Sequence, residues 1–102
     1  MIPALILAAA VATAPAAPQG AAAVTGTASW GYGWSGAVTR LPRGTRIRVC
    51  GPLACWSGRS VGYGPDARLH RIADLSRPLF ARLCGDPSMG LCKVRITLPR
   101  GA

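Results

Sequence analysis

The stretch PRGTRIRVCGPLACWSGRSVGYGPDARLHRIADLS, residues 42–76 of the 102-residue chain, decides the fold. Near its start, Arg46–Val49 alternates arginine with aliphatic residues, the period-two pattern of a strand with one wet and one dry face. Cys50 and Cys55 then flank the tetrapeptide GPLA, whose residues favour a turn. The stretch therefore predicts a β-hairpin that a disulfide closes at its turn.

The other two cysteines, Cys84 and Cys92, flank the turn-rich segment GDPSMGL in the same way. Four cysteines allow three connectivities, and proximity favours Cys50–Cys55 together with Cys84–Cys92. Zinc coordination by the thiolates is the alternative, but the spacings C-x4-C and C-x7-C are not those of a usual zinc knuckle. Because so short a domain is marginally stable without covalent links, we predict two disulfides and no metal.

Further elements are predicted on both sides of this stretch. Thr25–Gly36 is expected to form a first strand that runs into a loop, and Arg59–Tyr63 another short strand. Lys93–Leu98 alternates with period two and predicts the last strand. One helix is expected at Arg77–Cys84, because Ser76 is a good N-cap and a proline falls in the tolerated first turn. A mostly β chain with one short helix and no βαβ rhythm indicates a small closed barrel.

The first 23 residues carry no charged side chain, and an apolar run from Ile2 to Val11 precedes an Ala/Pro-rich tract. These features are typical of a secretory signal peptide, and the run is shorter than the ~20 residues of a membrane-spanning helix. We therefore expect a leader at residues 1–23, one domain at residues 24–102 and no transmembrane anchor. No cysteine precedes Cys50, so a lipidated N-terminus is not expected.

Four segments carry a resemblance to a known family. They are GTASW (Gly26–Trp30), LPRGTRIRV (Leu41–Val49), GPDARLHRIADLS (Gly64–Ser76) and VRITL (Val94–Leu98). The second and third resemble the LPxGTxVxV and GP-x4/5-RIIDLS segments of rare lipoprotein A-like proteins, which are relatives of the expansins. The resemblance implies a six-stranded double-psi β-barrel that acts on cell-wall polysaccharide, peptidoglycan above all.

By this resemblance, Asp74 in RIADLS corresponds to the aspartate that lines the sugar groove. A lytic transglycosylase needs one acid, which protonates the glycosidic oxygen and then takes the proton of the muramyl C6 hydroxyl. Asp74 is thus the candidate catalytic residue. The structural alternative is that its carboxylate accepts backbone N–H groups and stabilises the fold.

The chain departs from the family pattern at two positions. Gly62 stands where the family has the aspartate of DRGP, and Val38 stands where it has a histidine three residues before LPxGT. Asp66 is a weaker catalytic candidate that could replace the missing aspartate, although aspartate is also common in turns. His70, the single histidine, is another weak candidate for proton transfer, and a solvated loop position is the plainer interpretation.

The chain is rich in aromatic rings for its size, and flat rings stack on the apolar faces of sugars. Filling of the core is the alternative role, and we expect it to account for two or three of the rings. Trp34 and Trp56, which lie beside glycines and turns, are expected to be the most exposed. The candidate glycan-binding aromatics are Trp30, Tyr32, Trp34, Trp56 and Tyr63.

Positive charge dominates, with 12 Lys and Arg against 3 acidic residues and a net charge of +9. Arg46 and Arg48 are candidate glycan contacts, and with Lys93 and Arg95 they are expected to line strand faces. Such a surface attracts polyanions: muramyl carboxylates, teichoic phosphates or anionic lipid. No specific nucleic acid is expected. The residues 31–36 match GxGxxG, but they lack the strand-helix-strand context of a nucleotide site, so no cofactor is expected.

These features together predict a secreted monomer, extracellular or wall-associated and periplasmic in a two-membrane bacterium, that binds peptidoglycan or another anionic wall glycan. Whether it also cleaves glycan strands as a lytic transglycosylase is left open. A non-catalytic, expansin-like wall-loosening or binding module is one alternative. A cationic, disulfide-rich effector that acts on membranes or on a protein partner is another.

Overall fold

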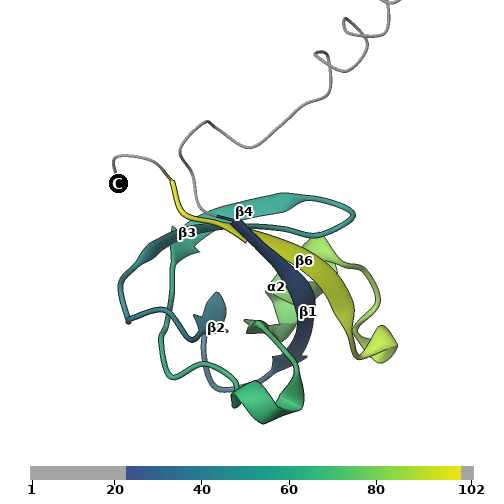
Figure 1. Cartoon of the computed structure of the whole chain (residues 1–102). Coiled ribbons are helices and arrows are strands. Elements are labelled where there is room, and N and C mark those ends of the chain that lie inside the picture. Colours follow the sequence, from purple (N-terminus) through teal and green to yellow (C-terminus); the bar gives the residue numbers. More distant parts are fainter. Residues whose placement is uncertain (1–22, 100–102) are drawn as a thin grey trace, which may run out of the picture.

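The structure, a computed structural model, describes residues 23–99 (Figure 1). Within these residues, one sheet of six strands curls into a nearly closed barrel, and one α-helix packs against it. The strands are β1 (Ala23–Gly31), β2 (Ala37–Thr39), β3 (Arg46–Cys50), β4 (Cys55–Arg59), β5 (Ala73–Ser76) and β6 (Cys92–Thr97). The helix is α2 (Arg77–Leu83), and two 3-10 turns are η1 (Ala67–Leu69) and η2 (Pro87–Met89).

The strand order is β2-β5-β1-β6-β3-β4. Strands β1 and β5 pair in parallel, and the other neighbouring strands pair antiparallel. The two ends of this order meet just after β4, where Ser60 forms a parallel bridge with Ala37 of β2. The N–H of Val61 donates to the carbonyl of Ala37 at 2.9 Å, and the Thr39 and Ser60 hydroxyls lie 2.7 Å apart. These bonds nearly close the sheet into a barrel.

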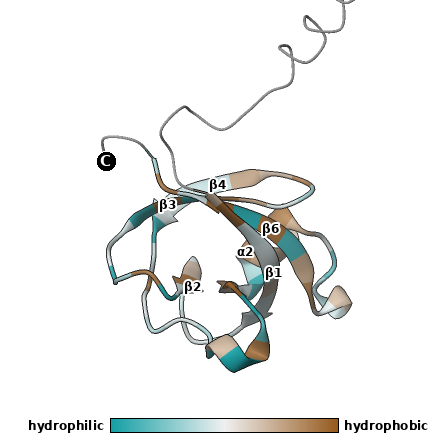
Figure 2. Cartoon of the chain, viewed as in Figure 1, coloured by the Kyte–Doolittle hydropathy of each residue, from teal (hydrophilic) through white to brown (hydrophobic). Residues whose placement is uncertain are grey.

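The core lies inside the barrel and under α2. Along β3 and β6, exposed basic residues alternate with buried aliphatic ones, as Figure 2 shows along β6. Thr97 departs from the predicted alternation: it is buried although it lies on the same side of β6 as the exposed Lys93 and Arg95. The fully or almost fully buried side chains are Ala28, Ala37, Ile47, Val49, Ala73, Leu75, Leu79, Phe80, Leu83, Cys84, Cys92, Val94 and Ile96.

Helix α2 begins where β5 ends, and it lies within the predicted range. Ser76 is its N-cap, but the Ser76 hydroxyl makes no capping bond. Instead it accepts the N–H of Gly36 at 3.2 Å, while the Ser76 N–H donates to the Gly36 carbonyl at 2.8 Å. The serine therefore holds the loop between β1 and β2 against the start of the helix.

The predicted disulfide pairs are confirmed. Cys50 is bonded to Cys55 across the β3–β4 hairpin, and Cys84 is bonded to Cys92, which joins the end of α2 to the start of β6. The alternative in which these thiols bind zinc is wrong, because all four sulfurs are used in the two bonds. The expected small, mostly β, six-stranded barrel with one short helix and two disulfides is thus confirmed.

Two expectations need comment. The predicted strand Arg59–Tyr63 is wrong beyond its first residues: β4 ends at Arg59, Ser60 makes one bridge, and the left-handed φ angles of Gly62 and Tyr63 (80° and 53°) turn the chain away. The predicted leader lies outside the described residues, except that Ala23 is the first residue of β1. No helix within residues 23–99 is long and apolar enough to cross a membrane.

Candidate functional site

Asp74 lies in the middle of β5, on the outer surface of the barrel. Its neighbours along the strand, Ala73 and Leu75, are fully buried, so the intervening side chain points outward. In the sheet register Asp74 lies opposite Ser29 of β1 on one side and Val38 of β2 on the other. The Asp74 side chain is 19% exposed and can be reached from solvent.

Two polar side chains contact the Asp74 carboxylate. The Ser29 hydroxyl donates a hydrogen bond to Asp74 Oδ1. The Arg71 Nε atom lies 3.2 Å from the same oxygen, an ion pair whose angles fall short of a hydrogen bond. The Arg71 carbonyl in turn accepts from Arg40 Nη1 at 2.7 Å, which fixes the segment that carries Arg71. Asp74 is therefore held in place by residues from β1 and from the segment just before β5.

The indole of Trp34 packs over Gly31, two residues along β1 from Ser29. A Cβ atom added at Gly31 would be 2.6 Å from Cη2 of Trp34, so the ring covers Gly31. Gly31 has the same parity in β1 as Ser29, so the ring covers the outer surface of β1 about 6.8 Å along the strand from Ser29. The Trp34 Nε1 atom is buried without a hydrogen-bond partner. We call this surface the Asp74 face; it consists of Ser29, Gly31, Trp34, Val38, Arg71 and Asp74.

Asp66 and His70 have other contacts. Asp66 caps η1 by accepting the N–H of Arg68 at 2.9 Å, and its carboxylate pairs with Arg68 Nη2 at 2.6 Å. The Arg68 guanidinium and N–H hold the pKa of Asp66 below its ordinary value. His70 is exposed, ends η1 with a left-handed φ of 57°, and donates its N–H to the Ala67 carbonyl. Within residues 23–99 no hydrogen bond or ion pair joins either residue to Asp74.

Trp30 and Tyr32 form a separate cluster near α2 and η2. The Trp30 Nε1 atom donates to the Pro87 carbonyl at 2.7 Å, and the guanidinium of Arg77 lies 5.4 Å from the centroid of the indole. Tyr32 meets Trp30 edge to face at a centroid distance of 5.5 Å, and it is 74% exposed. Trp30 thus ties η2 to β1, while Tyr32 presents a ring to solvent.

The expectation that Trp34 and Trp56 are the most exposed aromatics is wrong. Both are half-buried, whereas Tyr63 is 85% exposed. The physical reason is that a nearby glycine leaves room for an indole to pack flat: Trp56 covers Gly58 of its own strand and approaches Gly36. Trp56 also lines a hollow of about 250 Å³ together with Ser35, Gly36, Ser76, Pro78, Leu79 and Arg82.

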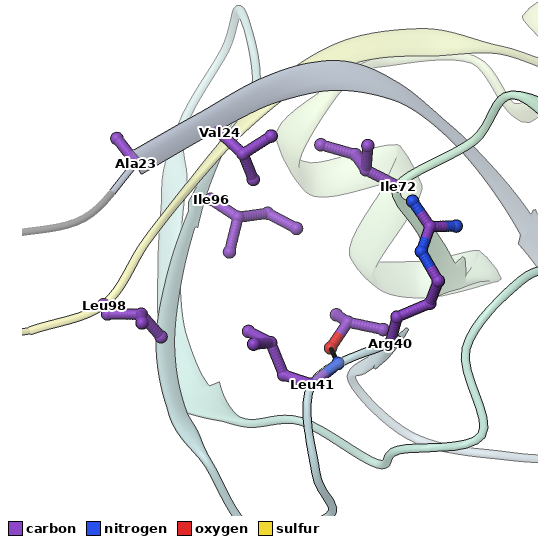
Figure 3. Close-up of a pocket in the computed structure, with 8 residues that line it drawn as sticks. Ala23, Val24, Arg40, Leu41, Ile72, Ile96 and Leu98 are labelled. Carbon is purple, nitrogen blue, oxygen red and sulfur yellow. Dashed lines mark hydrogen bonds between the residues drawn. The ribbon is translucent and has the colours of Figure 1, made fainter. Parts of the chain in front are cut away.

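Another hollow of about 280 Å³ opens at the mouth of the barrel (Figure 3). Its lining is almost wholly apolar, and one guanidinium, that of Arg40, reaches its rim. Arg40 Nη1 is already hydrogen-bonded to the carbonyls of Pro65 and Arg71. An apolar mouth does not suit a sugar, which needs polar partners for its hydroxyls. The lining residues are Ala23, Val24, Thr39, Arg40, Leu41, Ile72, Ile96 and Leu98.

The candidate glycan contacts Arg46 and Arg48 lie away from Asp74. Both are exposed on β3, and strands β6 and β1 separate β3 from β5 in the sheet. Tyr63 is exposed in the loop after β4, and no hydrogen bond of its side chain within residues 23–99 joins it to the Asp74 face. The structure therefore brings together Asp74 and Trp34 and leaves the other candidate residues elsewhere on the molecule.

Sequence reasoning missed Ser29 and Arg71. Both belong to quoted motifs, GTASW and RIADLS, so a signal was available. The contact of Ser29 with Asp74 depends on the parallel pairing of β1 with β5, which nothing local in the sequence specifies. Residues 23–99 contain no group of three His, Cys, Asp or Glu side chains that could hold a metal ion.

Comparison of the chain with protein-family models, with curated proteins and with solved structures finds no match. Interpretation of the Asp74 face therefore depends on its geometry and on the sequence motifs.

Proposed function

We propose that the chain is a secreted domain of the rare lipoprotein A-like kind that binds a wall glycan, peptidoglycan or a related polymer, at the Asp74 face. The observation that carries this proposal is that the indole of Trp34, packed over Gly31, lies on the same outer surface as the Ser29–Asp74–Arg71 group. Sugars are bound by a flat ring against their apolar side and by polar groups at their hydroxyls. The Asp74 face offers both on one solvent-accessible surface.

The register of the sheet supports the same family interpretation. Val38 occupies the position at which the family has a histidine, and it lies directly opposite Asp74 in the β2–β5 pairing. A histidine there would be next to the aspartate, as an acid–base pair requires. Export is supported by the two disulfides, which are typical of proteins from oxidising compartments.

Binding is the proposed activity because two proton-transfer groups of the family are missing. Neither the Val38 side chain nor the buried Gly62 can donate or accept a proton. Cleavage is the second candidate, favoured by the distinct position of Asp74 among the three aspartates. Asp66 and Asp86 accept backbone N–H groups in 3-10 turns, whereas Asp74 lies on the outer strand surface.

Binding is tested by sedimentation with purified sacculi from which phosphate polymers have been removed. Replacement Trp34→Ala is expected to weaken binding about three- to tenfold, which corresponds to ~0.5–1.5 kcal/mol of stacking. Trp34→Phe, which keeps a flat ring, is the matched control and is expected to retain most of the affinity. Circular dichroism checks that both variants fold. Equal binding by wild type and Trp34→Ala, or no binding by wild type, would refute the proposal.

Cleavage is tested by assay for anhydromuramyl products. In a lytic reaction Asp74 would give its proton to the leaving oxygen and take one from the C6 hydroxyl as the anhydro ring closes, so the acid is regenerated. Asp74→Asn can do neither and is expected to abolish product while binding persists. Product from a folded Asp74→Asn protein would remove this role from Asp74. Absence of product from wild type would leave the binding function alone.

A further inference from the structure

A second surface, on the outer side of β3, β4 and β6, is strongly basic. The basic side chains of this surface point outward, and the residues between them along each strand point toward the core. All of its cations are exposed. We call this surface the basic face; it is formed by Arg46, Arg48, Arg59, Lys93 and Arg95.

Two arginines of the basic face are direct cross-strand partners. Arg46 of β3 lies opposite Arg59 of β4, and like charges at opposed positions destabilise a sheet. The ion pairs of the described residues are Arg68–Asp66 and Arg71–Asp74, and neither lies on this face. The structure thus keeps two arginines at directly opposed strand positions without a carboxylate partner, an arrangement that a bound anion would stabilise.

Recesses lie beside this pair. A hollow of about 480 Å³ is lined by Gly44, Thr45, Arg46, Arg59, Leu98 and Pro99. A second hollow of about 260 Å³ is lined by Arg46, Ile47, Ser57, Gly58, Arg59 and Pro99. Arg59 is oriented by a hydrogen bond from its Nη1 to the Gly44 carbonyl at 3.0 Å. Both recesses include the opposed arginines, so an anion can enter between them.

We propose that the basic face binds a linear phosphodiester polymer of the wall, an alditol-phosphate chain of the teichoic type. One phosphate would lie between Arg46 and Arg59, because the guanidinium fork matches phosphate oxygens. Arg48 follows at two residues along β3, about 6.8 Å from Arg46 by strand geometry. Repeated cations at this spacing suit repeated charges on an extended chain.

Two observations favour this polymer over nucleic acid. The described strands place no aromatic ring on the basic face, whereas sites for single-stranded nucleic acid use rings to stack bases. The two disulfides indicate an oxidising compartment, which is not the compartment that holds most of a cell's nucleic acid. This site is separate from the Asp74 face. The basic face lies on β6, β3 and β4, whereas β2 and β5 of the Asp74 face lie in another part of the barrel.

The test is calorimetric titration of the folded protein with a defined poly(glycerol phosphate) oligomer at low and high salt. We expect affinity to fall with salt, and Arg46→Gln/Arg59→Gln to weaken binding at least about tenfold. The slope of affinity against salt should decrease by about one unit for each arginine removed. The control Arg68→Gln/Arg82→Gln removes the same charge from η1 and α2, and it should change affinity less than twofold, about the size of a general charge effect.

The Tm at low salt checks that the double variant folds. Removal of the like-charge contact favours folding, whereas Arg59→Gln removes one exposed hydrogen bond to the Gly44 carbonyl, so a large fall in Tm is not expected. The oligomer contains no glycan, so the result does not depend on the Asp74 face. Three outcomes would overturn the proposal: no binding of the oligomer, equal weakening by the control pair, or tighter binding to single-stranded DNA or to anionic vesicles than to the oligomer.

Discussion

Gly64 lies where the loop after β4 crosses the end of β2. A Cβ atom at this position would overlap the carbonyl carbon of Thr39 and the nitrogen of Arg40. Both are backbone atoms, which cannot move aside as the tip of a flexible side chain can. The glycine of the Gly64-Pro65 motif is therefore required by a close approach of two chain segments.

The first prediction is that Gly64→Ala lowers the free energy of unfolding by about 3 kcal/mol or more, the upper end of the range for overpacking. Gly33→Ala is the control, since a Cβ there meets nothing within 4 Å and only the positive φ of 105° is unfavourable. That variant should lose about 1 kcal/mol. Urea denaturation measures both, and equal losses would contradict the crossing of segments as the cause.

The second prediction concerns two capping aspartates. The pKa of Asp66 is lowered by hydrogen bonds from Arg68, and the pKa of Asp86 is lowered by the N–H and then the hydroxyl of Ser88. Since the folded pKa lies below the unfolded value, their stabilisation is present above the unfolded pKa and is lost as pH falls through the folded pKa. An NMR titration of the carboxyl carbons should find both midpoints below the ordinary aspartate value.

Arg68→Gln serves as the matched variant for this titration. It should raise the pKa of Asp66 and leave that of Asp86 unchanged, because Arg68 contacts the first carboxylate alone. An unchanged Asp66 midpoint in the variant would show that the side chain of Arg68 does not lower it.

Residue roles could be predicted from the sequence where a motif or a local spacing specifies them. The motif RIADLS singled out Asp74, although no strand was predicted there, and the turn role of Asp66 follows from its place after a proline. The contact between Ser29 and Asp74 could not be predicted, because it joins residues 45 positions apart through sheet pairing. Packing of Trp34 on Gly31 was misjudged, since the same glycines that suggest a loop also make room for a ring.

Among the elements, α2 and β6 are joined by Cys84–Cys92, and β3 and β4 by Cys50–Cys55. The first pair is buried in the core, at 4% and 7% exposure, whereas the second is half-buried. Loss of the first pair therefore removes core packing as well as a covalent link.

The third prediction is that both double Cys→Ala variants lose about 2–4 kcal/mol of stability, the usual range for a native disulfide. Cys84→Ala/Cys92→Ala should lose more than Cys50→Ala/Cys55→Ala. Urea denaturation under nonreducing conditions compares them with wild type. A larger loss from the hairpin pair would show that core packing around Cys84 and Cys92 contributes little.

The predictable elements were those with a local signal. Alternation indicated β3 and β6, and the combination of Ser76 with a first-turn proline indicated α2. The error at Arg59–Tyr63 has a different origin. That segment closes the barrel through Ser60 and then turns at Gly62 and Tyr63. The closure depends on pairing with β2, which lies about 20 residues earlier in the chain.

At the scale of the whole molecule, the nearly closed sheet points its outer surface in several directions. The Asp74 face lies on β1, β5 and β2, and the basic face lies on β6, β3 and β4. A small barrel with two disulfides could be predicted from the chain length, the cysteine spacing and the alternation of residues along the strands. The order β2-β5-β1-β6-β3-β4 could not be predicted from these alone, because it is set by the packing of all strands together.

The most direct test of the account is a titration of isotope-labelled protein with peptidoglycan fragments free of phosphate polymers, followed by amide NMR. Glycan binding at the Asp74 face should shift amides that cluster around Ser29, Trp34 and Asp74 and leave the amides of β3 and β4 unchanged. Fragments that shift no amide, or that shift mainly those of Arg46, Arg48 and Arg59, would contradict glycan binding at the Asp74 face.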